Sequence, residues 1–313
     1  MKETLEIKKI TEHQWNEDSF PFVSISCIAF NQANYIRETL DRFLDQQTNF
    51  LVEILIHDDA SSDGTDLIIQ EYSKKYPNIF KPKIQKENQY TKIGFSLGFL
   101  EFNRARGKYI AICEGDDYWS DKRKLLKQVE LLENDPNASF CFHSTEYLYN
   151  TEDPKFQLNK PKYIPPNSRF GIKDLIELDS QLISNCSVMM RANLVQQFPS
   201  WVTNAPVGDL PLCLYLGTIG SMAFIEEPMA VYRVNSIGSW SNELISSRNY
   251  RIAHLSKLKS MWIEFDKWTG FKFTKSIKLR IAQINRAILI AKLSNFKFFR
   301  LFLKFLKSFL SYQ

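Results

Sequence analysis

Short apolar runs alternate with amphipathic helical segments over the first quarter of the chain, and this alternation constrains the fold more than any other feature. Residues 22–28, FVSISCI, and 51–56, LVEILI, are short and rich in apolar and β-branched side chains, as buried strands are. Each run is followed by a segment with helical spacing of its apolar residues, at 34–47 and 66–76. Repeated strand–helix units of this length predict a mostly parallel sheet with helices on both faces.

The pattern continues less regularly through 81–92 and through an amphipathic stretch at 95–106. A strand is predicted at 107–113, GKYIAIC, a strong helix at 120–135, and a further strand at 138–145. A proline-rich connecting segment follows between 153 and 168, and a less regular mixture of helix and strand patterns resumes beyond it. The sequence therefore predicts an α/β fold with a central sheet flanked by helices.

Composition narrows the class of protein. The chain has 313 residues, of which 44% are hydrophobic and 24% charged, as expected for a globular protein. Its five cysteines are scattered without a CxxC spacing, which favours reduced thiols over a disulfide framework or a zinc site. The N-terminal residues lack the apolar core of a signal peptide, and no stretch approaches the roughly 18 apolar residues of a spanning helix. These features predict a cytoplasmic protein.

Charge is distributed unevenly. The net charge is +5, yet the residues from Phe271 onward contain ten Lys or Arg and no Asp or Glu. We expect an N-terminal arm at 1–20, a main domain at 21–240 and a helical, basic, amphipathic extension at 241–313. In that extension a polar stripe runs through a helix otherwise covered by Phe and Leu, formed by Lys297, Arg300, Lys304, Lys307 and Ser308.

A cationic stripe beside a broad apolar face is typical of a helix that lies in the interface of an anionic membrane. We therefore predict peripheral attachment to the inner face of the cell membrane through this extension. The alternative is a helix docked on the protein's own core or on a second subunit, which leaves a homo-oligomer open. Nucleic acid is not an expected partner, because no nucleic-acid-binding module is recognisable.

Polar clusters follow three of the predicted strands, at 29–31, 58–59 and 114–117. In an open parallel sheet such clusters meet at one edge, where ligands bind. Acidic groups gathered at one point repel each other unless a cation compensates them. Carboxylates together with substrate phosphates are the usual ligands of Mg²⁺. Neither a GxxxxGK[ST] loop nor a GxGxxG loop is present, so the sequence predicts that a divalent metal, Mg²⁺ or Mn²⁺, holds the phosphates.

Four segments together carry a resemblance to a known family: VSISCIAFNQANYIRETLDRFLDQQ, VEILIHDDASSDGT, GKYIAICEGDDYW and SDKRKLLKQVELLE. In this order they resemble the nucleotide-sugar-dependent glycosyltransferases of family 2. The resemblance implies the GT-A fold, a Rossmann-like mostly parallel sheet, and an inverting transfer. It also implies that 21–150 forms the nucleotide-binding half of the domain and 151–240 the acceptor half.

The resemblance also implies roles for individual residues. Asp59 would accept a hydrogen bond from the nucleotide base, whereas Asp58 would be structural, although a helix-capping loop is the alternative for this pair. Glu114 and Asp116 stand at the family's DxD position, with Glu in place of the usual first Asp. Asp117 is the expected metal ligand, and Asp116 is expected near the ribose or the metal. The base pocket would be lined by Ile28, Ala29, Phe30 and Asn31.

The acceptor half supplies the remaining candidates. Asp209, before an apolar helical run, is the expected general base, and a plain helix N-cap is its alternative. Arg233 is a candidate phosphate or acceptor contact and Trp240 a candidate for stacking on a sugar, with a surface ion pair and a core aromatic as alternatives. Asn235 stands where many relatives carry a His that helps to hold the metal or the diphosphate. Two histidines near strand ends, His57 and His143, are expected to make local hydrogen bonds rather than to act in catalysis.

The sequence thus predicts a metal-dependent, inverting glycosyltransferase. Its donor would be a nucleoside-diphosphate sugar, with UDP the favoured nucleotide, and its acceptor a hydroxyl of a glycan or a lipid-linked molecule in surface polysaccharide or glycoconjugate biosynthesis. Two alternatives remain open at this point. One is a nucleotidyltransferase, although AFNQANY after the first strand lacks the Gly-rich basic loop usual in that class. The other is a non-catalytic protein of the same fold that binds glycans or membranes.

Overall fold

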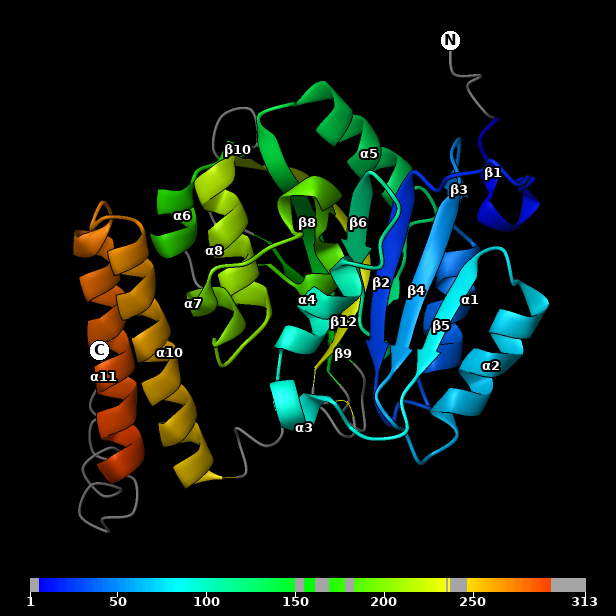
Figure 1. Cartoon of the computed structure of the whole chain (residues 1–313). Coiled ribbons are helices and arrows are strands. Elements are labelled where there is room, and N and C mark those ends of the chain that lie inside the picture. The colour runs from blue at the N-terminus through cyan, green and yellow to red at the C-terminus, as the bar shows by residue number, and fades with distance from the viewer. Residues whose placement is uncertain are drawn as a thin grey trace. The chain divides into compact units, whose positions relative to one another are not determined.

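The computed structural model describes residues 6–149, 155–160, 169–177, 183–234, 236 and 247–293. The chain divides into two compact units, residues 1–239 and 240–313 (Figure 1). The first unit holds a central sheet with helices around it. The second unit is helical.

The central sheet of the first unit has the strand order β10-β12-β8-β11-β6-β2-β4-β5, and two short strands pair outside this path, β7 with β12 and β9 with β8. A separate two-stranded ribbon joins β1 (Lys8–Lys9) to β3 (Gln47–Thr48). The bounds of the central strands are β2 Val23–Ala29, β4 Val52–Asp58, β5 Phe80–Ile84, β6 Tyr109–Ile112, β7 Tyr118–Trp119, β8 Ala138–Tyr149, β9 Lys155–Asn159, β10 Arg169–Phe170, β11 Met189–Arg191 and β12 Ser221–Val234.

Strands β6, β2, β4 and β5 are all parallel, as the strand–helix alternation predicts. Strand β2 is buried along most of its length and β4 along all of it, which accounts for their nearly continuous apolar sequences. Because these strands run the same way, the residues that follow β2, β4 and β6 reach one edge of the sheet. The predicted α/β fold with helices around a central sheet is confirmed.

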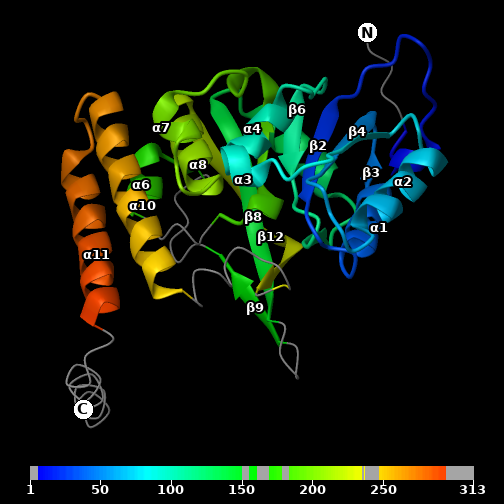
Figure 2. The same ribbon diagram turned by 60° about the horizontal axis from the view of Figure 1, so that its bottom comes forward.

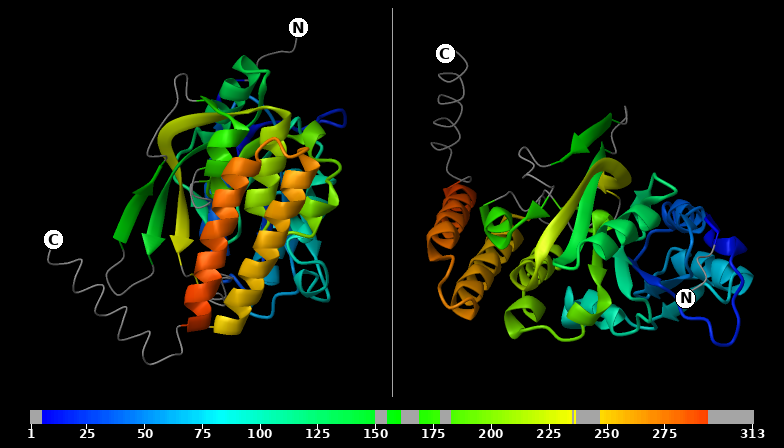
Figure 3. Two further views of the ribbon diagram at one scale, coloured as in Figure 1. Left: turned by 90° about the vertical axis from the view of Figure 1, so that its left-hand side faces the viewer. Right: turned by 90° about the horizontal axis from the view of Figure 1, so that it is seen from above.

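Beyond β6 the pairing changes direction. Strand β11 is antiparallel to both β6 and β8, whereas β8 and β12 are parallel to each other. Strand β12 is long, and its register against β8 shifts between Ile225 and Ala230. Figure 3 shows the pronounced curvature of this strand. After the bend β12 also pairs with β7, which directly follows the EGDD motif, so its C-terminal end is brought to the acidic segment.

Helices cover the sheet. Aromatic packing of Phe43 on Trp119, with ring centroids 4.7 Å apart, joins α1 to β7 within the core. The helix bounds are α1 Ile36–Leu44, α2 Thr65–Lys75, α3 Tyr90–Ile93, α4 Ser96–Phe102, α5 Lys124–Asn134, α6 Ile172–Glu177, α7 Ser200–Thr203 and α8 Asp209–Ile219, and short 3-10 turns lie at Ile10–Glu12, Asn185–Ser187 and Ala192–Leu194.

The second unit contains a pair of helices, α10 (Arg248–Trp268) and α11 (Thr274–Leu293), which lie side by side (Figures 1 and 2). Buried residues recur every seventh position of α11, at Ile277, Ile284 and Ala291, as expected where one helix packs along another. Within the described residues, no helix is long and apolar enough to traverse a bilayer. The predicted cationic stripe at 297–308 lies outside the described residues.

Candidate active site

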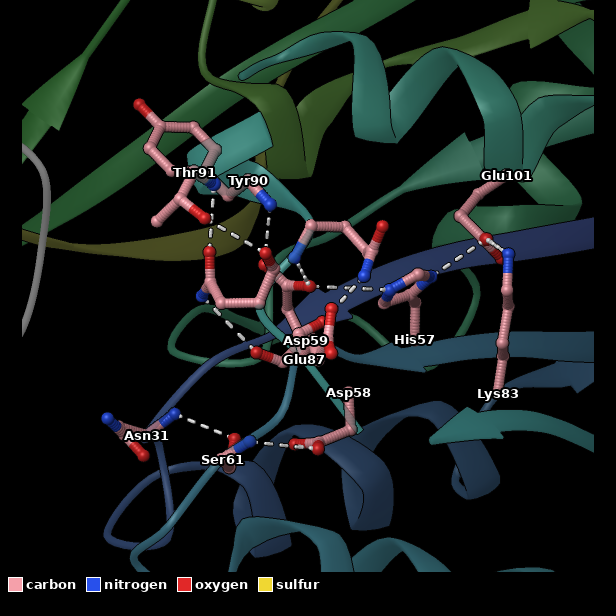
Figure 4. Close-up of polar contacts among 12 residues, drawn as sticks. Asn31, His57, Asp58, Asp59, Ser61, Lys83, Glu87, Tyr90, Thr91 and Glu101 are labelled. Carbon is pink, nitrogen blue, oxygen red and sulfur yellow. Dashed lines mark hydrogen bonds and ion pairs between the residues drawn. The ribbon is translucent and has the colours of Figure 1, made fainter. Parts of the chain in front are cut away.

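The ends of β2 and β4 are joined by hydrogen bonds that begin at Asn31. Its backbone is left-handed, with φ of 51°, a conformation that Asn adopts more readily than most residues. The Asn31 amide donates to Ser61 Oγ at 2.9 Å, and its side-chain oxygen accepts from the Ser62 amide at 2.8 Å. Figure 4 shows how Asn31, Ser61 and Asp58 follow one another at this edge. Asn31 thus fixes the loop after β4.

The other residues predicted for the base pocket differ in exposure. Ala29 is fully buried, and Ile28 is half-buried. Phe30 is 41% exposed, which is unusual for a large apolar side chain and leaves its ring available to a ligand.

Asp58 and Asp59 are both buried. Asp58 accepts from the Ser61 amide, and its other oxygen has no partner among the described residues. Burial raises the pKa of Asp58. Asp59 is 1% exposed, and its two oxygens accept from the backbone amides of Gln89 and Tyr90, at 2.6 and 2.9 Å (Figure 4). These two hydrogen bonds connect the start of α3 to the end of β4 through Asp59.

The EGDD segment, residues 114–117, follows β6 and is contacted by α1. The Thr39 hydroxyl lies 3.0 Å from the carbonyl oxygen of Gly115 and 2.7 Å from that of Asp117. A Cβ at Gly115 would meet Gln32 Oε1 at 2.4 Å and Ile36 Cδ1 at 2.8 Å, distances too short for any side chain. A larger residue at the centre of the motif would therefore force Gln32 and Ile36 to move.

Glu114 and Asp116 are the two motif acids that are not fully buried. Glu114 Oε1 accepts from Asn185 Nδ2 at 2.6 Å, while Oε2 has no partner among the described residues. Burial, and then the charge of Asp116, raise the pKa of Glu114 to about 7. Asp116 accepts from the Ser236 hydroxyl, and burial raises its pKa as well. Among the described residues, the hydrogen-bond partner of Glu114 is the uncharged Asn185, and Asp116 adds a like charge nearby.

Asp117 is 1% exposed and turns into the fold. Its Oδ1 accepts the backbone N–H of Arg233 at 2.8 Å. Burial, and then the charges of Asp116 and Glu114, raise the pKa of Asp117 well above its usual range.

Arg233 is committed to contacts within the first unit. Its guanidinium donates to the carbonyl oxygen of Asp116 and to the Glu38 carboxylate, and it lies 4.6 Å from the centroid of the Tyr118 ring. Only 10% of its side chain is exposed. In this arrangement Arg233 supports the backbone of the acidic segment from the side of β12.

Asp209 is the first residue of α8, and Gly208 holds the N-cap position. Its Oδ1 accepts from the Leu210 amide at 2.7 Å, and burial raises its pKa. The charge of Asp209 adds to the upward shift of the Glu114 pKa, so the two carboxyls are within electrostatic reach. The structure thus places Asp209 near enough to Glu114 for their charges to interact.

The acidic segment is where the sequence predicts a divalent cation. Among the described residues, no group of three or more His, Cys, Asp or Glu side chains is arranged to hold a metal ion by itself. A Mg²⁺ site built from one or two carboxylates and substrate phosphates needs no such group. The unpartnered Oε2 of Glu114 and the raised pKa values of Glu114 and Asp116 are what a site completed by a cation would show. The residues present fit that kind of site.

Several residues that shape the site were not predicted. Thr39 reads in the sequence only as part of a helix face, and Asn185 as part of an apolar segment. Their polar contacts with the EGDD segment span more than 70 positions, and a local pattern carries no signal for them. Two other predicted positions, Trp240 and Asn235, lie outside the described residues.

The two predicted histidines do make hydrogen bonds. His57 Nδ1 lies 2.8 Å from Glu101 Oε1, and His143 Nδ1 lies 2.7 Å from the carbonyl oxygen of Ser144.

Residues 24–198 match the family described as Glycosyl transferase family 2. An uncharacterised protein of Mycobacterium tuberculosis is 38% identical over 233 residues, which make up 73% of this chain but 63% of that relative's length. The putative teichuronic acid biosynthesis glycosyltransferase TuaG of Bacillus subtilis is 33% identical over 133 residues, covering 42% of this chain and 49% of TuaG.

Two solved structures resemble the fold. Residues 1–349 of S. aureus TarS, in complex with UDP-GlcNAc, superpose with a TM-score of 0.56 at 15% identity, covering 87% of this chain and 73% of that one. The mannosyltransferase PcManGT of Pyrobaculum calidifontis, in complex with GDP-Man and Mn²⁺, gives a TM-score of 0.56 at 14% identity, covering 100% of this chain and 85% of that one. At these identities the likeness concerns the fold.

Proposed function

Because the chain belongs to glycosyl transferase family 2, we propose that it is a glycosyltransferase that moves a sugar from a nucleoside-diphosphate sugar to an acceptor hydroxyl. The observation that carries this proposal is the convergence, at one edge of the sheet, of the loops after β2 and β4 with the acidic segment after β6. This is the edge at which open α/β sheets bind ligands. Family membership favours this activity over nucleotidyl transfer.

The donor pocket would be formed by the half of the domain at 21–150. Phe30 and Asn31 would line the base pocket, together with the backbone of Ile28 and Ala29. Asp59 would accept an N–H of the base, because an ionised carboxylate retains lone pairs beyond the two that accept from backbone amides. The ligands of the two solved neighbours, UDP-GlcNAc and GDP-Man, support a nucleoside-diphosphate sugar as donor. UDP remains the favoured nucleotide.

The metal, Mg²⁺ or Mn²⁺, would be held by Asp116 and, with it, Glu114. When bound it would act as a Lewis acid and offset the charge that develops on the departing diphosphate. The Mn²⁺ in the complex of PcManGT supports a divalent cation for this fold. Asp117 remains the alternative ligand, but its carboxylate is buried and accepts the Arg233 amide, which suits a supporting role better.

Asp209 would take the proton of the acceptor hydroxyl as that oxygen attacks the anomeric carbon. Its raised pKa makes it a better base than an exposed aspartate. A single displacement of this kind inverts the anomeric centre and needs no covalent enzyme intermediate. Arg233 would keep Asp116 and Asp117 in place rather than contact phosphate directly, because its guanidinium already has protein partners.

The acceptor is proposed to be a glycan or a lipid-linked molecule, bound by the half at 151–240 during surface polysaccharide or glycoconjugate synthesis. The biosynthetic role named for TuaG supports that class of acceptor. The basic extension at 241–313 would attach the protein to an anionic membrane surface on the cytoplasmic side. The absence of acidic residues after position 270 supports this attachment.

A donor screen tests the proposal. The full chain is incubated with Mg²⁺ or Mn²⁺ and with UDP-, GDP- and dTDP-sugars, and released nucleoside diphosphate is measured with and without a mixed-oligosaccharide acceptor. Release from one donor class, abolished by EDTA and restored by metal, is the expected result. Failure to bind or turn over every donor in the panel would contradict the proposal and favour a non-catalytic role.

A further inference from the structure

A short segment of the chain joins the proposed base pocket to the proposed general base. It begins at Gln89 and Tyr90, whose amides donate to the buried Asp59 carboxylate, and it continues through α3 into α4. Figures 1 and 2 show α3 and α4 beside α7 and α8, and α8 begins with Asp209. The two ends of this segment therefore lie at the two parts of the candidate site.

A glycine turns the chain sharply between α3 and α4. Gly94 has φ of 57° and ψ of −142°, a conformation that residues with a Cβ rarely adopt. Its amide donates to the Tyr90 carbonyl oxygen at 2.7 Å. After this turn the Phe95 ring meets the Tyr90 ring edge-on, with centroids 5.2 Å apart and an interplanar angle of 88°. Phe95 thus packs on the residue whose amide contacts Asp59.

The Phe95 side chain also packs against the N-terminus of α8. A Cβ placed on Gly208, the N-cap residue, would lie 3.4 Å from Phe95 Cδ1 and 3.5 Å from Phe95 Cβ, which are ordinary van der Waals distances. The next residue reinforces this contact, because the Ser96 hydroxyl donates to the carbonyl oxygen of Thr203, at the end of α7, at 2.7 Å. Asp209 directly follows Gly208, so Phe95 lies against the backbone that leads into the proposed base.

The Asp209 carboxyl accepts a hydrogen bond from its neighbour in the chain, the Leu210 amide. A hydrogen bond between adjacent residues ties the carboxyl to its own backbone and not to the rest of the site. The place of the carboxyl in the site therefore depends on where the first turn of α8 lies. That turn begins at the residue that Phe95 contacts.

We propose that Phe95 is a positioning residue for Asp209, which holds the first turn of α8 at a fixed place relative to the nucleotide pocket. The role in catalysis rests on the proposed function, because it takes Asp209 as the general base and Asp59 as a contact of the nucleotide. A general base must lie within hydrogen-bond reach of the proton that it removes. A displacement of about 1 Å can lower the rate about 100-fold. Phe95 would thus act on the reaction through Asp209.

The Leu210 amide reports on this arrangement in ligand-free protein, because it donates to Asp209 Oδ1. In Phe95→Ala the first turn of α8 loses the ring that packs on its N-cap, and it should open more often. Hydrogen exchange of the Leu210 amide should accelerate about tenfold, measured by NMR.

Phe198→Ala is the matched control. It also removes a half-buried aromatic ring that packs between α4 and α8, but this ring contacts Phe99 and Tyr215, with centroids 4.5 and 5.3 Å apart, away from the first turn of α8. Its Leu210 exchange rate should equal that of the wild type. A wild-type rate at Leu210 in Phe95→Ala, or the same acceleration in both variants, overturns the proposal.

Kinetics of the active enzyme separate positioning from a merely structural role. In Phe95→Ala, kcat per folded molecule should fall about tenfold or more, because the base is displaced. The KM for the donor should change much less, because Asp59 accepts from backbone amides at Gln89 and Tyr90, which the substitution retains. Phe95→Leu, which restores much of the apolar volume, should recover part of kcat. A normal kcat in folded Phe95→Ala contradicts the positioning role.

Gly94→Ala disturbs the same segment without removing a packed side chain. Its Cβ would meet no atom of the described residues within 4 Å beyond the adjacent ones, so the substitution strains only the turn. If Phe95→Ala does not fold, this variant decides: faster Leu210 exchange supports the proposal, and a wild-type rate overturns it. If the wild type uses no donor, the proposed function fails, while exchange in free protein still decides whether Phe95 positions Asp209.

Discussion

The backbone N–H of Arg233 donates to the buried Oδ1 of Asp117 across a separation of 116 residues in the chain. Two neighbouring acids in the motif consequently face different surroundings. Asp116 lies at the sheet edge and accepts a hydrogen bond from the Ser236 hydroxyl. Asp117 is buried and connects β12 to the acidic segment.

Asp116→Ala is expected to lower kcat/KM by about 100-fold or more, because it removes the proposed ligand of the cation that stabilises the leaving diphosphate. Its free energy of unfolding without metal should change little, since removal of a buried carboxyl with a raised pKa offsets the loss of the Ser236 hydrogen bond. Steady-state kinetics and urea unfolding of the same sample check both outcomes.

Asp117→Ala should instead lower the free energy of unfolding by about 1–3 kcal/mol, because it leaves the Arg233 N–H without its buried acceptor. Asp117→Asn, which retains an oxygen for that N–H, is the control and should lose much less stability. If Asp117→Asn is fully folded yet inactive, Asp117 is the metal ligand, as the sequence predicts.

Asp209→Asn is expected to lower kcat by about 10²–10⁴-fold with little change in the KM for the donor, because it removes the proposed general base. The wild-type kcat should fall as the pH drops through the Asp209 pKa, and this limb should lie above the ordinary aspartate range because burial raises that pKa. A normal kcat in Asp209→Asn would show that Asp209 is not the general base.

In metal-free protein the contribution of Glu114 to stability should fall as the pH rises from about 4.5 to about 7. The folded state holds the Glu114 proton more tightly than the unfolded chain does, so it binds more protons in this range and loses stability as the pH increases. Glu114→Gln should flatten the dependence, by about 2 kcal/mol over the range. Urea unfolding at several pH values in EDTA measures the slope, and an unchanged slope in Glu114→Gln would contradict the assignment.

Gly115→Ala should destabilise the protein by about 1–3 kcal/mol and abolish most activity, because the new Cβ overlaps Gln32 and Ile36 and displaces the acidic segment. Gly98→Ala in α4 is the matched control, since its Cβ would meet only Ile28 Cδ1 at an ordinary 3.7 Å. Alanine is also the better helix former, so this control should be neutral or slightly stabilising. Thermal unfolding compares the two.

The first half of the fold could be predicted because its signals are local. The strand and helix patterns correctly placed β2, α1, β4 and α2 to within a few residues, and the parallel order followed from their alternation. The antiparallel β11 could not be placed this way. It has three residues, Met189–Arg191, and its position between β6 and β8 depends on pairing with residues far away in the chain.

The candidate site, like the fold, could be predicted only in part from local sequence patterns. Acidic clusters after strands identify the sheet edge, but not which carboxylate faces the ligand. The opposite orientations of Asp116 and Asp117 depend on Ser236 and Arg233, which approach from β12 and the residues just after it. Similarly, the partner of His57 is Glu101, which reads in the sequence as one polar position of an amphipathic helix.

The contact between β12 and the acidic segment also limits how far this protein can be truncated from its C-terminus. The family match ends at residue 198, whereas β12 lies at Ser221–Val234. A polypeptide cut at the end of that match would keep every carboxylate of EGDD and still lack the strand that covers Asp117. A shortened form of this protein that keeps the contacts around the acidic segment must therefore extend at least through Ser236.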